Sequence, residues 1–148
     1  MPSDEVIIHD AHLSAIDRVT LYRILALRTD VFVVEQNCAY PELDGRDLEP
    51  STRLVWAEDD GAVLATLRLL VDPDGTARIG RVATSAAARG RGLAAKLMER
   101  ALELAESRPV VLHAQSYLVA WYERFGFVRT GPDFDDDGIP HAPMRRPS

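Results

Sequence analysis

The chain has 148 residues, and 17 Lys and Arg against 23 Asp and Glu give it a formal net charge of −6. This length is typical of one domain whose core needs no disulfide or metal staple, and the single cysteine, Cys38, excludes an intrachain disulfide and a cysteine-rich zinc module. The acidic pI of about 5.2 argues against nucleic acid, no apolar stretch approaches the ~20 residues of a membrane span, and the first residues do not resemble a secretory signal. We therefore expect one cytoplasmic domain over residues 1–148 that binds neither nucleic acid nor a membrane.

Hydrophobic periodicity and turn residues predict helices and strands along the whole chain. Ser14 or Asp17 can cap the first helix, and Asp59-Asp60-Gly61 is a strong hairpin signal. The apolar run over 110–114 is typical of a strand buried on both faces. The expected elements in chain order are a strand over 6–8, a helix to about 32, strands over 53–58, 63–71 and 78–84, a helix from about 93 to 107, the strand over 110–114, a short helix over 116–125, and strands over 127–130 and 140–145. One α/β domain with a mixed sheet is the economical interpretation.

The local charge reverses between Gly75 and Met98, a segment with five cations and no acidic residue. It contains Arg89-Gly90-Arg91-Gly92-Leu93-Ala94 at an expected strand-to-helix transition. Glycines there allow backbone N–H groups to approach a ligand closely, and a helix N-terminus adds unpaired donors and a partial positive charge. The segment therefore predicts a phosphate or pyrophosphate site, and the alternative is a solvated basic turn before an ordinary helix.

Other phosphate motifs do not fit this segment. It lacks the Gly-Lys-Ser/Thr of a Walker A loop. The stretch Gly90–Ala95 matches the letters G-x-G-x-x-A of a dinucleotide fingerprint, but the next expected strand ends at Ala114-Gln115 without the acidic residue that would bind a ribose. The context therefore argues against a dinucleotide oxidoreductase, which stays a third alternative.

An apparent calcium motif near the C-terminus also fails. Asp133-x-Asp135-x-Asp137-Gly138 copies the first half of a calcium loop, but position twelve is Met144 rather than glutamate. Pro140 and Pro143 also prevent the helix that should follow. We expect a solvated acidic turn and no metal site.

Arg89-x-x-Gly92-x-Ala94 resembles the Q/R-x-x-G-x-G/A acyl-CoA signature of the GCN5-related N-acetyltransferase (GNAT) superfamily. The resemblance is closer to its ElaA-like branch and extends in order over nearly the whole chain. One departure is Ala86, where many relatives carry proline, which affects the rigidity of a turn rather than the chemistry. The further blocks that carry the resemblance are the segments over 21–47, 79–82, 114–115, 121–127 and 137–141.

The resemblance implies a single α+β domain with a central, mixed, mostly antiparallel and twisted sheet of about six or seven strands and about four helices. The strands near 78–84 and 110–115 would separate, so that their exposed backbone groups bind the pantetheine arm of acetyl-CoA. An N–H near Val82 or Ala83 would polarise the thioester carbonyl. The cofactor-binding residues implied are Val82, Ala83, Thr84, Arg89, Gly90, Arg91, Gly92, Leu93, Ala94 and Gln115.

Direct acetyl transfer to an amine makes two proton demands. A lysine-like amine with a pKa of ~10.4 must lose a proton, and the leaving thiolate gains one. Tyr122 matches the position where the superfamily commonly places the acid, although a purely packing role is the alternative. The candidate bases are Glu35 first, His141 second and His113 third, and a chain of water molecules is an equal alternative.

The acceptor cannot be identified from the residues, but their types suggest its charge. Arg28 lies on the apolar stripe of the first expected helix, so it needs a carboxylate partner, either to shape an acceptor pocket or to neutralise a buried loop. The resemblance also implies Gln36, Cys38 and His141 as substrate-binding residues, with packing as the default role of Cys38. The acidic residues that suggest a cationic amine are Glu35, Glu42, Asp44, Asp135, Asp136 and Asp137, and Arg28 is expected to pair with Glu35, Asp44 or Asp47.

The resulting prediction is an acetyl-CoA-dependent N-acetyltransferase that acts on a primary amine of a small molecule or peptide and exists as a monomer or homodimer. The alternative from another class is a non-catalytic acyl-CoA-sensing or protein-interaction module on the same fold.

Overall fold

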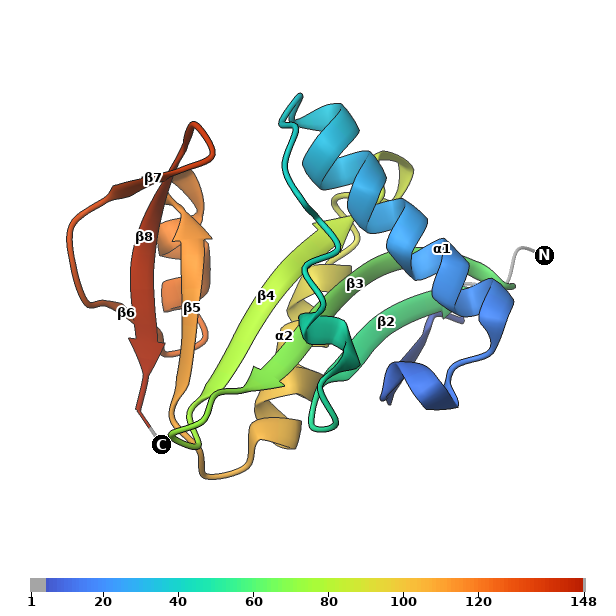
Figure 1. Ribbon diagram of the computed structural model, residues 1–148, viewed down its shortest axis with the longest axis horizontal. Coiled ribbons are helices and arrows are strands. Elements are labelled where there is room, and N and C mark those ends of the chain that lie inside the picture. Colours follow the sequence, from blue (N-terminus) through green and yellow to red (C-terminus); the bar gives the residue numbers. More distant parts are fainter. Residues whose placement is uncertain (1–4, 148) are drawn as a thin grey trace.

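The strands of the computed structural model, which describes residues 5–147, follow the order β1-β2-β3-β4-β5-β8-β6, with β7 paired to β8 (Figure 1). Neighbouring strands are antiparallel except for β4 and β5, which are parallel. The bounds are β1 (Ile7–Ala11), β2 (Arg53–Asp59), β3 (Ala62–Val71), β4 (Ala77–Thr84), β5 (Val110–Gln115), β6 (Val128–Arg129), β7 (Phe134–Asp136) and β8 (Ile139–Arg146). The expected mixed, mostly antiparallel sheet is confirmed, and β7 brings it to eight strands among the described residues.

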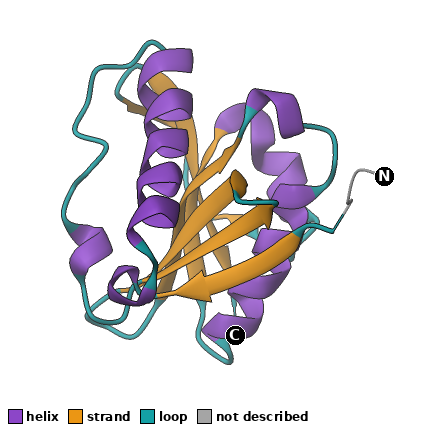
Figure 2. Ribbon diagram, turned by 90° about the vertical axis from the view of Figure 1, so that its right-hand side faces the viewer, coloured by secondary structure: helices purple, strands orange, loops and turns teal. Residues whose placement is uncertain are grey.

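Helices cover both faces of the sheet (Figure 2). Asp17 caps the first helix by accepting from the N–H groups of Val19 and Thr20. The helices are α1 (Arg18–Thr29), α2 (Leu93–Ala105) and α3 (Val119–Glu123), and a π-helical segment, η2 (Asp30–Glu35), continues α1. The short 3₁₀ turns are η1 (Leu13–Ala15), η3 (Arg46–Leu48), η4 (Ala86–Ala88) and η5 (Ser116–Leu118). The structure thus has three α-helices in residues 5–147 rather than about four, and the first helical region reaches Glu35 only by changing to π geometry.

The apolar core is divided by the sheet. On one face, α2 packs Leu97, Met98 and Ala101 against the strands, at the spacing of one helix face. On the other face, Ile24 of α1 packs against Leu54 and Trp56 of β2. No helix described over residues 5–147 is long and apolar enough to cross a lipid bilayer.

The parallel strands β4 and β5 separate soon after they meet. They pair only at Ala77–Val110 and Arg78–Val111, whereas β4 continues to Thr84 and β5 to Gln115. Figure 1 shows the two ribbons diverging from this point. We call this region the β4–β5 splay (residues 79–84 and 112–115). Its expected position is confirmed.

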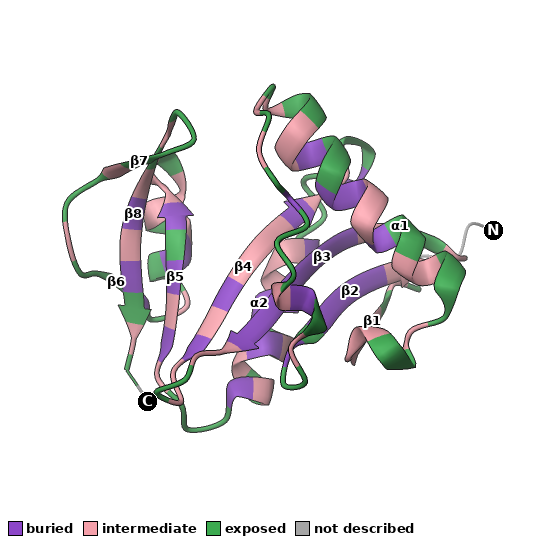
Figure 3. Ribbon diagram, in the orientation of Figure 1, coloured by how far each residue is buried: buried purple, intermediate pink, exposed green. Residues whose placement is uncertain are grey.

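The prediction that the strand over 110–114 is buried on both faces is wrong. Val110, Leu112 and Ala114 are buried, but His113 is exposed, and the burial colours alternate along β5 (Figure 3). The physical reason is the position of α1, which packs against β3 and β4 and leaves the His113 face of β5 open (Figure 1).

Candidate active site

Strand β4 has a β-bulge on the edge that pairs with β3, within the residues that form the splay. Thr66 lies opposite Ala83 and Arg68 opposite Gly80, so β4 has one more residue than β3 between these pairs. Arg81 has φ +52°, which places it in the left-handed region. A bulge leaves the extra residue outside the ladder and bends the strand. Arg81 and Val82 therefore depart from regular pairing with β3, directly before Ala83, where the thioester was expected.

The predicted phosphate loop lies between β4 and α2. Gly90 and Gly92 have φ of +84° and +72°, and Gly92 is the residue immediately before α2. A Cβ at either position would meet open space among the described residues, so conformation rather than crowding favours glycine. The first N–H groups of α2, at Leu93 and Ala94, lack partners within an ideal helix. With exposed Arg89 and Arg91 beside them, these groups can bind a diphosphate.

Arg89 forms a contact across the fold. Its Nη2 lies 2.7 Å from Oε1 of Glu35 at the end of η2, and its Nε donates to the Thr84 carbonyl. The hydrogen bond from Arg89 lowers the pKa of Glu35, and that of Arg89 is raised in turn. Both side chains are 45% exposed, so an incoming anion can compete for Arg89.

Tyr122 of α3 lies in an aromatic cluster. Its ring meets Trp121 edge-on at 4.9 Å and Phe127 at 6.3 Å between centroids. Burial raises the pKa of Tyr122 to about 12, so the hydroxyl is protonated at neutral pH. A protonated phenol is therefore available to donate.

Tyr117 is a residue that the sequence reasoning missed. It belongs to η5, just after β5, and is 78% exposed. Its charge contributes to the raised pKa of both Arg89 and Tyr122, so it lies near both side chains. An exposed tyrosine directly after a strand bordering the splay was the available signal.

Arg28 has two carboxylate partners. Its Nε donates to Glu42 at 2.8 Å, and its two terminal nitrogens bind Asp47 at 2.8 and 3.1 Å. Asp47 was among the three expected partners, whereas Glu42 was not. The structure does not bring Arg28 to Glu35, which binds Arg89 instead. Arg28 thus ties the loop after η2 to α1.

Asp44 links β3 to β4 through a second group of ion pairs. It accepts two hydrogen bonds from Arg68, at 2.8 and 2.6 Å, and lies 3.4 Å from Nη2 of Arg81. These arginines hold the pKa of Asp44 far below its usual range, the hydrogen bond from Arg68 being the largest cause. Arg81 also lies 2.8 Å from Glu42. The suggestion that Glu42 and Asp44 attract a cationic acceptor is corrected, because arginines already neutralise both.

The loop after η2 also reaches the β7–β8 turn. The thiol of Cys38 donates to the carbonyl of Asp137 at 3.3 Å, across 99 residues of chain. The Gln36 N–H ends η2 by donating to the carbonyl groups of Val31 and Val34, and its side chain is half-buried. The segment after η2 therefore contacts the turn between β7 and β8.

Two histidines and a phenylalanine line the open face of β5. The His113 ring meets Phe134 edge-on at 5.0 Å, and Phe134 stacks with His141 at 6.0 Å. Nδ1 of His141 lies 2.8 Å from the Ile139 carbonyl. Burial, and then the charge of Arg78, lower the pKa of His113. His113 is therefore neutral at pH 7 and able to accept a proton.

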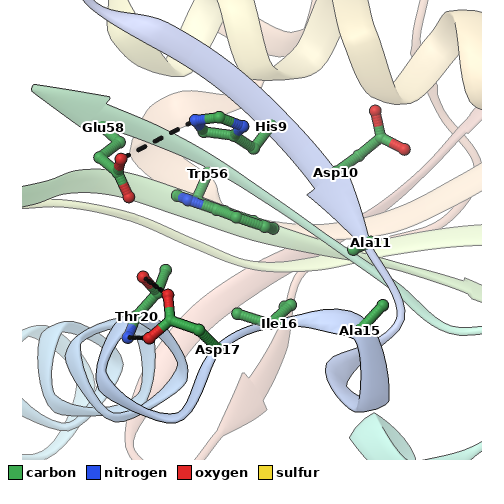
Figure 4. Close-up of a pocket in the computed structure, with 9 residues that line it drawn as sticks. All are labelled: His9, Asp10, Ala11, Ala15, Ile16, Asp17, Thr20, Trp56 and Glu58. Atoms are coloured by element: carbon green, nitrogen blue, oxygen red, sulfur yellow. Dashed lines mark hydrogen bonds and ion pairs between the residues drawn. The ribbon is translucent and has the colours of Figure 1, made fainter. Parts of the chain in front are cut away.

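The described residues also form a hollow of about 440 Å³ far from the splay, between β1, β2 and the start of α1 (Figure 4). Its carboxylates already have partners. Asp10 pairs with Arg100 at 2.8 Å, Asp17 caps α1, and Glu58 lies 3.9 Å from His9, which stacks on Trp56. In residues 5–147, no cluster of three or more His, Cys, Asp or Glu could hold a metal ion. The candidate active site is therefore the splay with its phosphate loop.

The comparisons with known proteins agree with this geometry. The family model described as acetyltransferase (GNAT) domain matches residues 27–147. A UPF0039 protein of Mycobacterium tuberculosis is 51% identical over 136 residues, which are 89% of this chain and 87% of the relative. Protein ElaA of Escherichia coli is 40% identical over 145 residues, 93% of this chain and 94% of the relative.

Two solved structures are also similar. A crystal structure of an acyl-CoA N-acyltransferase from Pseudomonas aeruginosa aligns with a TM-score of 0.90 at 48% identity, covering 96% of this chain and 99% of that one. The crystal structure of Escherichia coli ElaA aligns with the same TM-score at 36% identity and the same coverage. The chain therefore belongs to the GNAT acyltransferase superfamily and to its ElaA-like branch.

Proposed function

We propose that this chain binds acetyl-CoA at the β4–β5 splay and transfers the acetyl group directly to a primary amine of a small molecule or peptide. The observation that carries the proposal is the divergence of β4 and β5 beside a glycine-containing, cationic helix N-terminus. The diverging strands offer backbone groups to the pantetheine arm, from Val82 to Thr84 on one side and at Gln115 on the other. The N–H groups of Gly90 to Ala94, with Arg89 and Arg91, bind the diphosphate.

In the proposed chemistry, the amine nitrogen attacks the thioester carbonyl carbon and a C–N bond forms. Charge builds up on the carbonyl oxygen, and an N–H of the bulge near Val82 or Ala83 stabilises it. The C–S bond then breaks, and the phenol of Tyr122 donates its proton to the leaving sulfur. A phenol is protonated at neutral pH, as this role requires, and burial keeps Tyr122 in that form.

The amine must also lose a proton. Glu35 was the first candidate, but its carboxylate is engaged in an ion pair with Arg89, 2.7 Å away. His113 is neutral at pH 7 and lies on the open face of β5. We propose that the proton leaves through water to His113, with His141 and Glu35 as the alternatives that single substitutions test. Exposed carboxylates at Asp135 to Asp137, near the β7–β8 turn, favour a cationic acceptor.

The experiment that tests this function combines binding with turnover. Isothermal calorimetry should detect CoA and acetyl-CoA binding, and substitution of both Arg89 and Arg91 by Glu should abolish the heat. A panel of primary amines and peptides, with detection of free CoA, should then identify an acceptor. Absence of binding by the unmodified protein would refute the proposal, whereas binding without CoA release over the panel would favour the non-catalytic acyl-CoA-sensing module.

A further inference from the structure

Arg81 has an unusual backbone conformation for its place in the fold. Five non-glycine residues in 5–147 have positive φ, and Arg81 is the one among them that lies inside a strand. The other four, at positions 37, 60, 106 and 137, lie in turns or at a helix end. Left-handed geometry is unfavourable for a residue with a Cβ, and glycine is the usual choice at the first position of such a bulge.

Three residues of the loop over 40–47 contact the Arg81 side chain. Its Nη2 donates to the Glu42 carbonyl at 3.1 Å, and its Nε lies 2.8 Å from Oε1 of the same residue. The guanidinium also lies over the ring of Tyr40, 5.4 Å from its centroid, and Tyr40 donates its hydroxyl to Glu42. Glu42 is only 4% exposed, so these contacts are shielded from water.

Asp44 binds both strands at the bulge. Arg68 of β3, which pairs with Gly80, donates two hydrogen bonds to Asp44. Arg81, the next residue of β4, lies 3.4 Å from the same carboxylate. The Asp44 carboxylate therefore joins Arg68, opposite the start of the bulge, to Arg81 within the bulge. The buried Arg28–Asp47 pair anchors the same loop to α1.

We propose that Arg81 is a positioning residue whose side chain, gripped by Glu42 and Asp44, holds the β4 bulge and so aims the backbone N–H near Val82 at the thioester carbonyl. Strained backbone persists where its surroundings over-determine it, and such strain clusters at functional sites. The inference rests on the proposed acetyl transfer, because the backbone amide matters only where charge develops on a carbonyl oxygen. It makes the loop over 40–47 a part of the catalytic apparatus.

The test compares three substitutions at one position. Arg81→Ala removes the grip, and left-handed geometry is still unfavourable for alanine, so we expect the bulge to relax. The kcat should then fall by about 10- to 100-fold, approaching the loss of one oxyanion donor. Arg81→Gly also removes the grip but adopts positive φ freely. We expect it to retain the bulge, a kcat several-fold above that of Arg81→Ala, and a higher urea midpoint. Arg81→Lys keeps the positive charge but lacks the planar guanidinium that contacts Glu42 and Asp44 together. Its kcat should therefore lie near that of Arg81→Ala.

Two further measurements separate positioning from other roles. The Kd for CoA should stay within about two-fold in all three variants, because the diphosphate binds at the phosphate loop, so the loss appears in kcat. Asp44→Asn should lower kcat in the same direction and non-additively with Arg81→Ala. Arg53→Ala, which changes an exposed side chain at the start of β2, is the matched control and should leave kcat unchanged.

The outcomes distinguish the two proposals. If the unmodified protein binds CoA and releases it with an amine, but Arg81→Ala and Arg81→Gly have equal kcat, the Arg81 assignment is overturned and the proposed function stands. If Arg81→Lys retains the full rate, the charge rather than the grip is what matters, and the assignment is again overturned. If the unmodified protein neither binds CoA nor turns it over, the proposed function fails and this inference fails with it.

Discussion

Arg28 of α1 and Asp47 form a bidentate ion pair, with nitrogen–oxygen distances of 2.8 and 3.1 Å. The Arg28 side chain is 1% exposed. Their sequence separation is 19 residues, so the pair closes the loop that follows η2. Glu42 completes the group from the other side of the guanidinium. Because the same loop grips Arg81, this pair supports the edge of the proposed active site.

Loss of Arg28 should destabilise the fold strongly. Arg28→Met leaves buried carboxylates without their shared cation, and breaking a buried pair by removing one partner costs about 3–5 kcal/mol. Urea denaturation followed by circular dichroism measures the free energy of unfolding. Arg53→Ala is the control, since its pair with Asp10 is exposed and 3.7 Å long and should contribute less than about 1 kcal/mol. A cost for Arg28→Met as small as that of the control would contradict the role of the pair.

The Glu35–Arg89 pair should compete with CoA. Glu35→Gln frees Arg89 for the diphosphate, and because an exposed pair contributes at most about 1 kcal/mol, CoA affinity should rise by no more than about five-fold. The gain should shrink at high salt. Calorimetric titration at two salt concentrations measures both effects. Arg89→Ala is the matched control, because adding Glu35→Gln to it should bring no further gain, and weaker CoA binding by Glu35→Gln alone would refute the competition.

The carboxylate of Asp44 should make the free energy of unfolding depend on pH. Its folded-state pKa lies far below its usual value, so the carboxylate stabilises the fold above about pH 4, the unfolded pKa, and loses this contribution as the pH falls toward the folded pKa. Urea unfolding of the unmodified protein and of Asp44→Asn should therefore differ most at neutral pH, and the difference should shrink steadily as the pH falls below about 4. An equal difference at every pH would mean that the carboxylate charge is not the stabilising feature.

Tyr122→Phe should remove the proton donor without disturbing the diphosphate. We expect kcat to fall roughly 10²-fold, the scale of general acid catalysis, with CoA affinity unchanged. Because the pKa of Tyr122 is raised to about 12, its deprotonation imposes no loss of rate below about pH 10, and the deficit should be similar from pH 6 to 9. Steady-state rates over that range provide the measurement. A variant with the unmodified rate would leave Tyr122 as a packing residue.

Much of the fold was predictable because its signals are local. The amphipathic spacing of α2, the turn at Asp60-Gly61 and the glycines before Leu93 each act within a few residues. Backbone conformation and hydrophobic periodicity depend on such neighbours, and a phosphate loop is one contiguous segment. The eighth strand, β7, escaped prediction because three residues carry too little periodic pattern to distinguish a strand from a turn.

The sequence by itself determined the order of most elements, the segment proposed as a phosphate loop and the family, because all three are written in contiguous motifs. Tertiary structure alone decided that Glu42 joins Asp47 on Arg28, that Glu35 faces Arg89, and that β5 is open on one face. Several carboxylates lie at comparable sequence separations from each arginine. Only the packing of distant strands and loops selects which arginine each carboxylate contacts. The strain at Arg81 has the same origin, since a left-handed arginine persists only where a folded loop holds its side chain.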